Sequence, residues 1–520
     1  MRQHLTPAIL ALFALGTVCC GDKTDDTAPD TPEADSDSDT DTDADADADS
    51  DADSDSDSDT DPNAPSTLAE SASAVLVGNA DRDRLGMVVT GRGDLDGDGH
   101  DDVIALAKGD GTYGYGTRGA LYVFGGPILE DMTAAEATAS LEDSTMLGHL
   151  ETVVILGDTN GDGFDDIAVA DGASGHSGLY LGPITGEGTF DEYDAMVSWS
   201  GGTYFPSTQA FAAGDVDGNG TADVIIDVGE TILVMATPLE GEVDGASLAF
   251  AVLEPPHPSY LDPCVEDPSH VKNPTLYERR GQSAAIGDLD GDGFGELIVT
   301  NWWWNEQWWD RDPSEPCEGY TGVARIVQGP VFGTIDLVSS ATTLYGEAGE
   351  GIYGVNEGAI HGDTDAIGDA NGDGLADFLI EGGEPATDFV VFGPLTSGGA
   401  IGDLLNVARI TGSEFSSSDL AGAGDVDGDG LDDLVMGIET DDYWDHGAAI
   451  MLAPFSGTRL IDDAEYLYRG EGENSWAGSS VSSAGDVDAD GLMDVIVGAD
   501  NTVVDGEYRG KVYLFYGTDL

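Results

Sequence analysis

The sequence is poor in positive charge. Of its 520 residues, 17 are Lys or Arg and 102 are Asp or Glu, which gives a formal net charge of −85. Proteins that bind nucleic acid place clustered Lys and Arg against the phosphates, so this composition excludes nucleic acid as a partner. A surface this acidic is also expected to repel bare anionic partners unless a bound cation bridges them.

Cysteine is scarce as well, with four residues in the whole chain. Cys19 and Cys20 end an apolar stretch from Leu5 to Val18 that is too short for a membrane span, so residues 1–20 are predicted to be a secretory signal. The adjacent cysteines resemble the lipidated cysteine of a bacterial lipoprotein, and contact with a membrane is expected only through such an anchor. Ala14-Leu15-Gly16 equally suits an ordinary signal peptidase, so both processing routes stay open.

Recognisable catalytic motifs are missing. The eight His show no zinc-type spacing, no nucleophile elbow is present, and no Gly-rich phosphate loop opens a helix. Carboxylate pairs of the glycosidase kind are uninformative, because any surface this acidic offers them. We therefore expect a protein that is not an enzyme. A calcium-dependent, lyase-like polysaccharide enzyme, with Lys272, Arg279 and Arg280 as its nearest basic cluster, stays an alternative, as does a purely structural surface protein.

What the sequence does contain is one acidic nine-residue loop in seven copies. The first copy spans residues 94–102, and an apolar run follows each copy at once, as in Val103-Ile104-Ala105. Oxygen ligands at positions 1, 3, 5 and 9, with the backbone carbonyl of position 7, suit calcium, which accepts about six to eight oxygens in a flexible shell. Glycine at position 6 permits the backbone turn that aims this carbonyl inward.

The predicted metal ligands are therefore five residues from each loop. Crowded carboxylates require a cation or protonation to relieve their repulsion, so up to seven structural Ca²⁺ ions are predicted, and acidic surface turns without metal are the alternative. In chain order the ligands are Asp94, Asp96, Asp98, His100, Asp102, Asp158, Asn160, Asp162, Phe164, Asp166, Asp215, Asp217, Asn219, Thr221, Asp223, Asp288, Asp290, Asp292, Phe294, Glu296, Asp369, Asn371, Asp373, Leu375, Asp377, Asp425, Asp427, Asp429, Leu431, Asp433, Asp486, Asp488, Asp490, Leu492 and Asp494.

The segments around each loop predict four strands. A first strand precedes the loop (Met87 to Gly93) and a second follows it, a third ends in Gly-Pro (Gly119 to Pro127), and a fourth is more variable (Ser247 to Leu253). Four antiparallel strands repeated seven times predict an all-β, seven-bladed β-propeller over residues 67–520. A fourth-type strand at Ala69 to Val77 is expected to pair with the last strand, Gly510 to Tyr516, which completes the seventh blade and removes an exposed edge.

Before the propeller, residues 21–66 consist almost entirely of Asp alternating with Ser, Thr and Ala. A segment with so little apolar surface and so much like charge is predicted to be disordered and extended. Its expected role is that of a spacer.

The repeat unit resembles the FG-GAP repeat. The motifs that carry the resemblance are Leu85-Gly86, the run Gly-Asp-Val-Asp-Gly-Asp-Gly at 424–430, Val497-Gly498-Ala499 and Gly510-Lys511-Val512-Tyr513. FG-GAP repeats build the seven-bladed head of integrin α subunits and of many bacterial surface proteins. The resemblance implies calcium in the loops between strands 1 and 2, and ligands on the opposite face. We therefore expect a monomeric, extracytoplasmic adhesion or recognition propeller, secreted or displayed on a bacterial surface, with a glycan or a cell-surface protein as its ligand.

The long insertions are expected on that opposite face. Flat indole rings beside carboxylates suit sugars, although the tryptophans of the insertion can instead pack into a small core of their own. A disulfide between Cys264 and Cys317, the expected pair in an exported protein, would bridge two neighbouring connections on this face. The candidate ligand-binding residues are Trp302, Trp303, Trp304, Trp308, Trp309, Tyr443 and Trp444, with Tyr113, Tyr115 and Trp476 on the same face.

Overall fold

The chain divides into two units, Met1–Asp61 and Pro62–Leu520, and all of the described residues lie in the second. The computed structural model describes residues 66–107, 119–142, 150–171, 176–190, 193–198, 209–227, 232–239, 241–254, 283–301, 322–346, 360–382, 387–412, 415–440, 446–472 and 474–520. No helix among these residues has the length and apolar character needed to cross a membrane.

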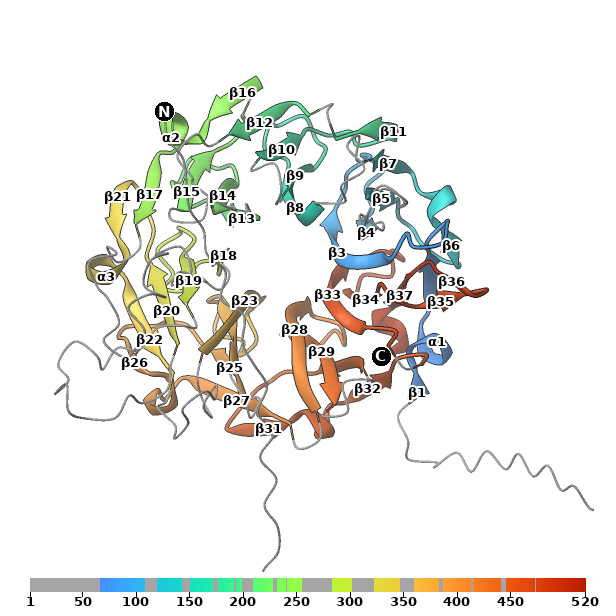
Figure 1. Ribbon diagram of the computed structural model, residues 1–520. Helices are drawn as coiled ribbons and strands as arrows, with labels where there is room; N and C mark the ends of the chain where they lie inside the picture. The colour runs from blue at the N-terminus through green and yellow to red at the C-terminus, as the bar shows by residue number, and fades with distance from the viewer. Residues whose placement is uncertain are drawn as a thin grey trace, which may run out of the picture. The chain divides into compact units, whose positions relative to one another are not determined.

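Seven sheets are arranged around a central axis. Figure 1 shows the first strand of each sheet, β3, β8, β13, β18, β23, β28 and β33, surrounding that axis, with the later strands stepping outward. Within a sheet, strands 1 to 4 pair antiparallel with their neighbours, as β3, β4, β5 and β7 do. The predicted all-β, seven-bladed propeller is therefore confirmed. We number the blades by their acidic loops, from blade 1 at Asp94 to blade 7 at Asp486.

The strands of blades 1 to 4 have the following bounds. Blade 1 contains β3 (Leu85–Gly93), β4 (Asp102–Ala107), β5 (Ala120–Phe124), β7 (Ala139–Glu142) and β11 (Gly186–Thr189). Blade 2 contains β8 (Leu150–Gly157), β9 (Asp166–Asp171), β10 (His176–Tyr180), β12 (Ala195–Ser198) and β16 (Gly241–Asp244). Blade 3 contains β13 (Gln209–Gly214), β14 (Asp223–Asp227), β15 (Ile232–Ala236), β17 (Ala251–Glu254) and β21 (Gly333–Asp336). Blade 4 contains β18 (Ser283–Ala285), β19 (Leu297–Asn301), β20 (Val323–Val327), β22 (Thr342–Tyr345) and β26 (Gly399–Ala400).

Blades 5 to 7 follow the same order. Blade 5 contains β23 (Ile360–Gly368), β24 (Asp377–Gly382), β25 (Thr387–Val391), β27 (Val407–Thr411) and β31 (Thr458–Leu460). Blade 6 contains β28 (Phe415–Gly424), β29 (Asp433–Thr440), β30 (His446–Met451), β32 (Tyr466–Arg469) and β1 (Ser66–Thr67). Blade 7 contains β33 (Ala477–Gly485), β34 (Asp494–Ala499), β37 (Lys511–Phe515), β2 (Ala74–Val77) and β6 (Met132–Thr133), with a separate hairpin of β35 (Val503–Val504) and β36 (Glu507–Tyr508).

The fifth strand of each sheet was not predicted. It is a short strand from the next blade that pairs parallel with the outermost of the four, as β11 of the blade 2 connection does with β7 and β6 of the blade 1 connection does with β2. It occupies hydrogen-bonding groups along the outer edge of the blade, which would otherwise be free to pair with another chain. Neighbouring blades are thereby joined at their rims.

One-turn helices follow several of these short strands. Two segments that were predicted to be strands throughout begin with such a helix. The segment predicted as a strand from Ala69 to Val77 consists of α1 (Leu68–Ser71) and then β2, and the segment from Ser247 to Leu253 begins in α2 (Gly245–Leu248) before β17. The first helical residue is buried in α1, since Leu68 is 0% exposed, and this anchor explains why an apolar segment bends instead of extending. Among the described residues the remaining short helices are α3 (Leu337–Ser340), η1 (Ala134–Glu136), η5 (Ile401–Asp403), η6 (Ile461–Asp463) and η7 (Gly517–Asp519).

The two ends of the propeller close the ring as predicted. β2, from the start of the described chain, pairs antiparallel with β37 at its end, with Ala74 opposite Leu514 and Val77 opposite Lys511. β1 adds a second tie, because it pairs parallel with β32 of blade 6. Blade 7 is therefore built from both ends of the propeller.

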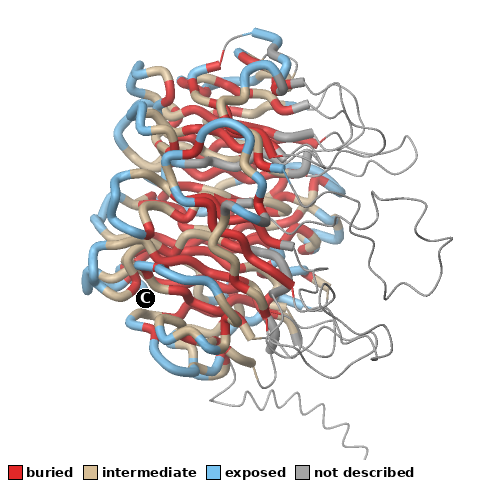
Figure 2. The backbone as a smooth tube through the Cα atoms, turned by 90° about the vertical axis from the view of Figure 1, so that its left-hand side faces the viewer, coloured by how far each residue is buried: buried red, intermediate tan, exposed pale blue. Residues whose placement is uncertain are grey.

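The hydrophobic core lies between the blades. The buried apolar residues form seven clusters among the described residues, and each cluster joins two neighbouring blades; one combines Val103 and Phe124 of blade 1 with Ile496 and Leu514 of blade 7. Figure 2 shows the buried residues as a band through the strands, with exposed loops along the edge where the C-terminus lies. Because every blade packs against two others, each blade depends on its neighbours for burial of its apolar side chains.

Candidate metal centres and the opposite face

The first carboxylate of each acidic loop shapes that loop. One oxygen of Asp94 accepts the N–H of Gly99 at 2.9 Å, and the other accepts the N–H of Gly97 at 2.6 Å. The bond to the position-6 glycine recurs in the six other loops. Gly99 has a φ of 90°, a left-handed conformation that glycine adopts without the steric penalty of a side chain. The predicted role of glycine at position 6 agrees with this geometry.

The position-9 carboxylates are buried, and in six of the seven blades they bridge two parts of the blade. Asp102, the first residue of β4, accepts the N–H of Leu95 at 2.8 Å through Oδ2 and the N–H of Gly126, just after β5, at 3.0 Å through Oδ1. No position-9 residue is more than 1% exposed. The set comprises Asp102, Asp166, Asp223, Glu296, Asp377, Asp433 and Asp494.

The residue at position 2 of each loop is buried and fixes the position-9 carboxylate, a role that was not predicted from the sequence. Its N–H donates to the position-9 carboxylate in all seven loops, over distances from 2.6 Å at Leu289 to 3.0 Å at Val426. Its side chain is at most 1% exposed. The signal was present in the sequence, because a mostly apolar residue stands in each loop between two hydrophilic ligand positions. The residues are Leu95, Thr159, Val216, Leu289, Ala370, Val426 and Val487.

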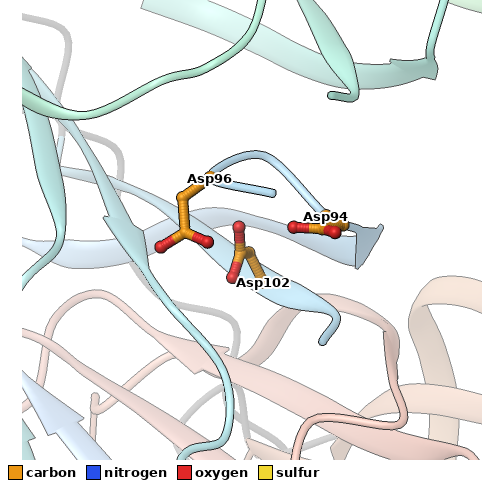
Figure 3. A group of neighbouring side chains, drawn as sticks. All are labelled: Asp94, Asp96 and Asp102. Atoms are coloured by element: carbon orange, nitrogen blue, oxygen red, sulfur yellow. The ribbon is translucent and has the colours of Figure 1, made fainter. Parts of the chain in front are cut away.

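Carboxylates at positions 1, 3 and 9 converge in five of the seven loops. Figure 3 shows the first group, Asp94, Asp96 and Asp102, close together at the end of blade 1. In each group the candidate ligand oxygens lie within 4.8 Å of one another. In the other two loops position 3 is Asn160 or Asn371, so only two carboxylates of this trio remain. The other groups are Asp215, Asp217 and Asp223; Asp288, Asp290 and Glu296; Asp425, Asp427 and Asp433; and Asp486, Asp488 and Asp494.

The position-5 side chains lie outside these groups of three. Asp98 Oδ1 accepts the N–H of His100 at 3.0 Å, and the equivalent bond from position 7 to position 5 occurs in the six other loops. Such Asx-type turns satisfy the backbone locally. One oxygen of each position-5 side chain is thus engaged within the loop. In blade 2 the second oxygen of Asp162 also accepts a hydrogen bond, from Nδ2 of Asn160 at 3.0 Å, and in blade 3 Asn219 has an amide nitrogen in place of the second oxygen.

Burial raises the pKa of the position-9 carboxyls. It raises the pKa of Asp102 to about 6 and that of Asp494 to about 7, while hydrogen bonds from the backbone oppose the shift and neighbouring carboxylates add to it. The same combination raises the pKa of Asp223, Glu296, Asp377 and Asp433 to about 7. The negative form is disfavoured at these positions, and a bound cation relieves the same electrostatic cost.

The donor set of these loops fits a hard divalent cation. Every side chain in the five groups offers carboxylate oxygen, the ligand type of calcium and magnesium rather than of zinc or copper. In the loop of blade 3, Oδ1 of the buried Asp223 has no hydrogen-bond partner among the described residues. A buried acceptor of this kind is costly unless it is satisfied. Five loops of the propeller therefore have carboxylate groups that could hold a metal ion.

Backbone hydrogen bonds link the acidic loops from blade to blade. The N–H of the position-8 residue donates to the carbonyl of the position-1 residue in the preceding loop, as from Asp165 to Asp94 at 2.9 Å. At the junction of blades 7 and 1, Ile128 donates to the position-2 carbonyl of Val487 at 2.8 Å. Bonds of these two kinds occur at six of the seven blade junctions. The loops therefore form a nearly continuous band on one face of the propeller.

The connections from strand 2 to strand 3 and from each blade to the next lie on the face of the propeller opposite the acidic loops. In blade 7, β34 starts at the acidic loop and ends at Ala499, so the connection that follows, residues 500–510, lies at the other edge of the sheet. Most of the sequence-predicted aromatic residues of this face lie outside the described residues, namely Tyr113, Tyr115, Trp302, Trp303, Trp304, Trp308, Trp309, Tyr443 and Trp444. Cys264 and Cys317, and Cys19 and Cys20, also lie outside them, so the disulfide and the lipid anchor stay predictions.

Trp476 is the described member of the predicted aromatic set. It is 43% exposed and lies beside Arg84, whose guanidinium carbon is 4.8 Å from the indole centroid. Arg84 also pairs with the buried Asp500, with 2.8 Å between Nη2 and Oδ2. Arg84 and Trp476 both have positive φ, 56° and 52°, which non-glycine residues adopt rarely. We call these three residues the closure corner, because they join the two ends of the propeller.

Backbone pairing holds the closure corner in place. Arg82 donates its N–H to the carbonyl of Tyr508 at 2.7 Å, and Leu85 donates to that of Arg509 at 3.0 Å. Leu85 and Gly510 also form a parallel bridge. Ser479 donates its N–H to the carbonyl of Trp476 at 3.2 Å, so the residue that carries the exposed indole is itself hydrogen-bonded to the fold beside this pairing.

Comparison with known proteins agrees with this fold and these loops. A family model described as "FG-GAP-like repeat" matches residues 158–226, and one described as "FG-GAP repeat" matches residues 477–515. Integrin alpha-D of Homo sapiens is 34% identical over 117 residues, which are 21% of this chain and 10% of that protein. Integrin alpha-PS2 of Drosophila melanogaster is 29% identical over 176 residues, 32% of this chain and 12% of that protein. The chain thus matches about a tenth of the length of these relatives. The crystal structure of BBS1N in complex with ARL6DN aligns with 84% of this chain and 96% of its own, at 8% identity and a TM-score of 0.40.

Proposed function

Since the chain carries FG-GAP repeats in an integrin-alpha-like seven-bladed propeller, we propose that it is a calcium-binding adhesion or recognition protein that works outside the cell. The difference between its two faces carries this proposal. One face consists of acidic loops tied to one another, and the other presents an exposed tryptophan from the closure corner.

The metal-binding role belongs to the acidic loops. In each of the five groups the carboxylates of positions 1, 3 and 9 would hold the ion, with the position-5 side chain and the position-7 carbonyl as further oxygen donors. In the loops of Asn160 and Asn371 an amide oxygen takes the place of one carboxylate, so up to seven ions are proposed. Bound calcium supplies positive charge that neutralises the crowded carboxylates and favours the folded state, to which alone it binds.

The recognition role belongs to the opposite face. An aromatic ring that is exposed on a hydrogen-bonded support provides contact area at low entropic cost, and Trp476 meets this description. A glycan or a cell-surface protein is the proposed ligand, because indole faces stack on sugar rings and on apolar protein patches alike. The tryptophans of the 302–309 segment, with Tyr443 and Trp444, are proposed to extend this surface.

The proposed location is extracytoplasmic. The predicted secretory signal, the acidic spacer of residues 21–66 and a lipid on Cys19 or Cys20 would together display the propeller at a bacterial surface as a monomer. The intact mass of the mature protein distinguishes the two processing routes, because a lipid adds mass to the cysteine that becomes the N-terminus, and an ordinary signal peptidase leaves none.

Ligand binding is the test of this function. The full chain is assayed in calcium on an array of glycans and cell-surface proteins, beside Trp476→Ala and a variant without residues 301–310. We expect both changes to weaken binding of the same ligand. Phe332→Ala is the matched control, because Phe332 is 57% exposed but lies on the side of the acidic loops, next to Val331, which donates its N–H to Val216 at 3.0 Å.

Three outcomes separate the candidates. Binding that is lost in the two variants and kept in the control supports recognition by the opposite face. Binding that all variants keep moves recognition to another surface. Unsaturated products released from an acidic polysaccharide would replace the binding function with the lyase-like alternative.

A further inference from the structure

Position 8 of the acidic loop makes a contact that reaches from one blade to the next. Three loops have Asp at this position, and in each the Oδ2 atom accepts the backbone N–H of the position-1 residue in the preceding loop. The distance is 2.8 Å from Asp101 to the nitrogen of Asp486, 2.9 Å from Asp165 to that of Asp94, and 2.7 Å from Asp432 to that of Asp369. The contact therefore joins the loops of blades 7 and 1, of blades 1 and 2, and of blades 5 and 6.

Glycine before position 1 leaves room for this carboxylate. A side chain on Gly485 would place its Cβ 2.3 Å from Oδ2 of Asp101, and one on Gly368 would place it 2.1 Å from Oδ2 of Asp432. Both glycines also have positive φ, 82° and 89°. The approach of the carboxylate to the neighbouring loop thus depends on the absence of a side chain at this position.

The residue that receives the contact is the one that shapes its own loop. Asp369 accepts the N–H of Gly372 at 2.7 Å and that of Gly374 at 2.9 Å through its carboxylate, while the carboxylate of Asp432 holds its backbone. Hydrogen bonds to a charged acceptor are stronger than neutral ones. A change in the loop of Asp432 therefore acts directly on the residue that organises the preceding loop.

We propose that Asp101, Asp165 and Asp432 are positioning residues that couple calcium binding between neighbouring loops. This inference rests on the proposed calcium-binding function. The loops of blades 7, 1 and 2 then bind as one coupled group, and those of blades 5 and 6 as a second. At the other junctions position 8 is Ala222, Gly295, Ala376 or Met493, none of which has a carboxylate. Coupling between binding sites is reciprocal, so calcium in either loop of a linked pair favours calcium in the other.

A double-mutant cycle on blades 5 and 6 tests the coupling. Hydrogen exchange of the full chain, measured by mass spectrometry at graded free calcium, gives the calcium concentration at which each loop becomes half protected. Asp427→Ala removes a position-3 carboxylate from the loop of blade 6. We expect this change to raise the midpoint of the 369–377 loop in blade 5 about tenfold, which corresponds to a coupling free energy of about 1.4 kcal/mol. In an Asp432→Ala background the same change leaves that midpoint where it is.

Blades 6 and 7 provide the matched control, because Met493 stands at position 8 of their junction. Asp488→Ala, which removes a position-3 carboxylate from blade 7, is expected to leave the midpoint of the 425–433 loop unchanged. Asp432→Asn keeps an acceptor oxygen without the charge and is expected to restore part of the coupling that Asp432→Ala removes. It also replaces Asp432→Ala in the experiment if the alanine variant folds poorly. The proposal is overturned if Asp427→Ala leaves the blade 5 loop unaffected, or if its effect persists without Asp432. Loops that show no response to calcium at all would overturn the calcium-binding function itself.

Discussion

Replacement of one buried position-9 carboxylate separates its two roles, as a hydrogen-bond acceptor and as a metal ligand. Asp494 is 0% exposed and accepts the N–H of Val487 and that of Gly517, each at 2.9 Å. Asp494→Asn keeps the shape of the side chain and one acceptor oxygen. The amide NH₂ group, however, then faces one of the two backbone N–H groups, and the negative charge is lost.

The expected size of the effect depends on calcium. A buried N–H without an acceptor costs about 1–3 kcal/mol. Loss of one ion from a solution that holds calcium at a hundred times its dissociation constant costs about 2.7 kcal/mol more. The free energy of unfolding should therefore fall by about 4–6 kcal/mol in calcium. In chelator the metal contribution is absent, and the substitution also removes a buried negative charge that the fold disfavours, because burial raises the pKa of Asp494 to about 7. The loss should therefore not exceed the cost of the unpaired N–H, which is about 1–3 kcal/mol.

Urea unfolding in calcium and in chelator measures this difference. Asp403→Asn serves as the control, because Asp403 is an exposed carboxylate outside the acidic loops, and exposed substitutions change stability by about 0.5 kcal/mol or less. An equal loss of stability in calcium and in chelator would refute the reasoning, since Asp494 would then act as a hydrogen-bond acceptor alone.

Three further predictions concern the whole propeller. Chelation should lower the melting temperature, because an ion that binds only the folded state stabilises it by mass action; identical melts in calcium and in chelator would exclude structural calcium. In chelator the melting temperature should fall as pH rises from 5 to 8, because burial raises the folded-state pKa of Asp223 and Glu296 to about 7. The fold therefore binds more protons than the unfolded chain in this window, and the opposite trend would contradict the burial argument. Gly97→Ala should lower the melting temperature by several degrees, because its φ is 82° and its Cβ would lie 2.2 Å from the ring of Phe164. Gly472→Ala should be nearly neutral, because no atom of the described residues lies within 4 Å of a Cβ there.

The folding information within a blade is local in the sequence. Loop spacing, the apolar run after each loop and the glycine before it predicted the strands on both sides of the loop, and these strands are present as β3 and β4 in blade 1. Ring closure could be predicted as well, because the propeller region begins with a fourth-type strand and ends with a third-type strand, and their pairing removes a free edge. Two segments that were predicted to be strands begin with a helix, α1 or α2. The sequence pattern could not predict these helices, because a short apolar run fits both a strand and a helical turn.

The sequence by itself thus determined the repeat, the blade number and the residue types of the metal loops, because each depends on neighbours within a few residues along the chain. Only the tertiary structure decided which of those residues meet. Burial of position 9 depends on the end of the third strand, as at Gly126. The grouping of positions 1, 3 and 9 without position 5 depends on the turn of each loop. The contact of Asp165 with Asp94 joins residues 71 positions apart, because two blades are packed side by side, and no local pattern contains that distance.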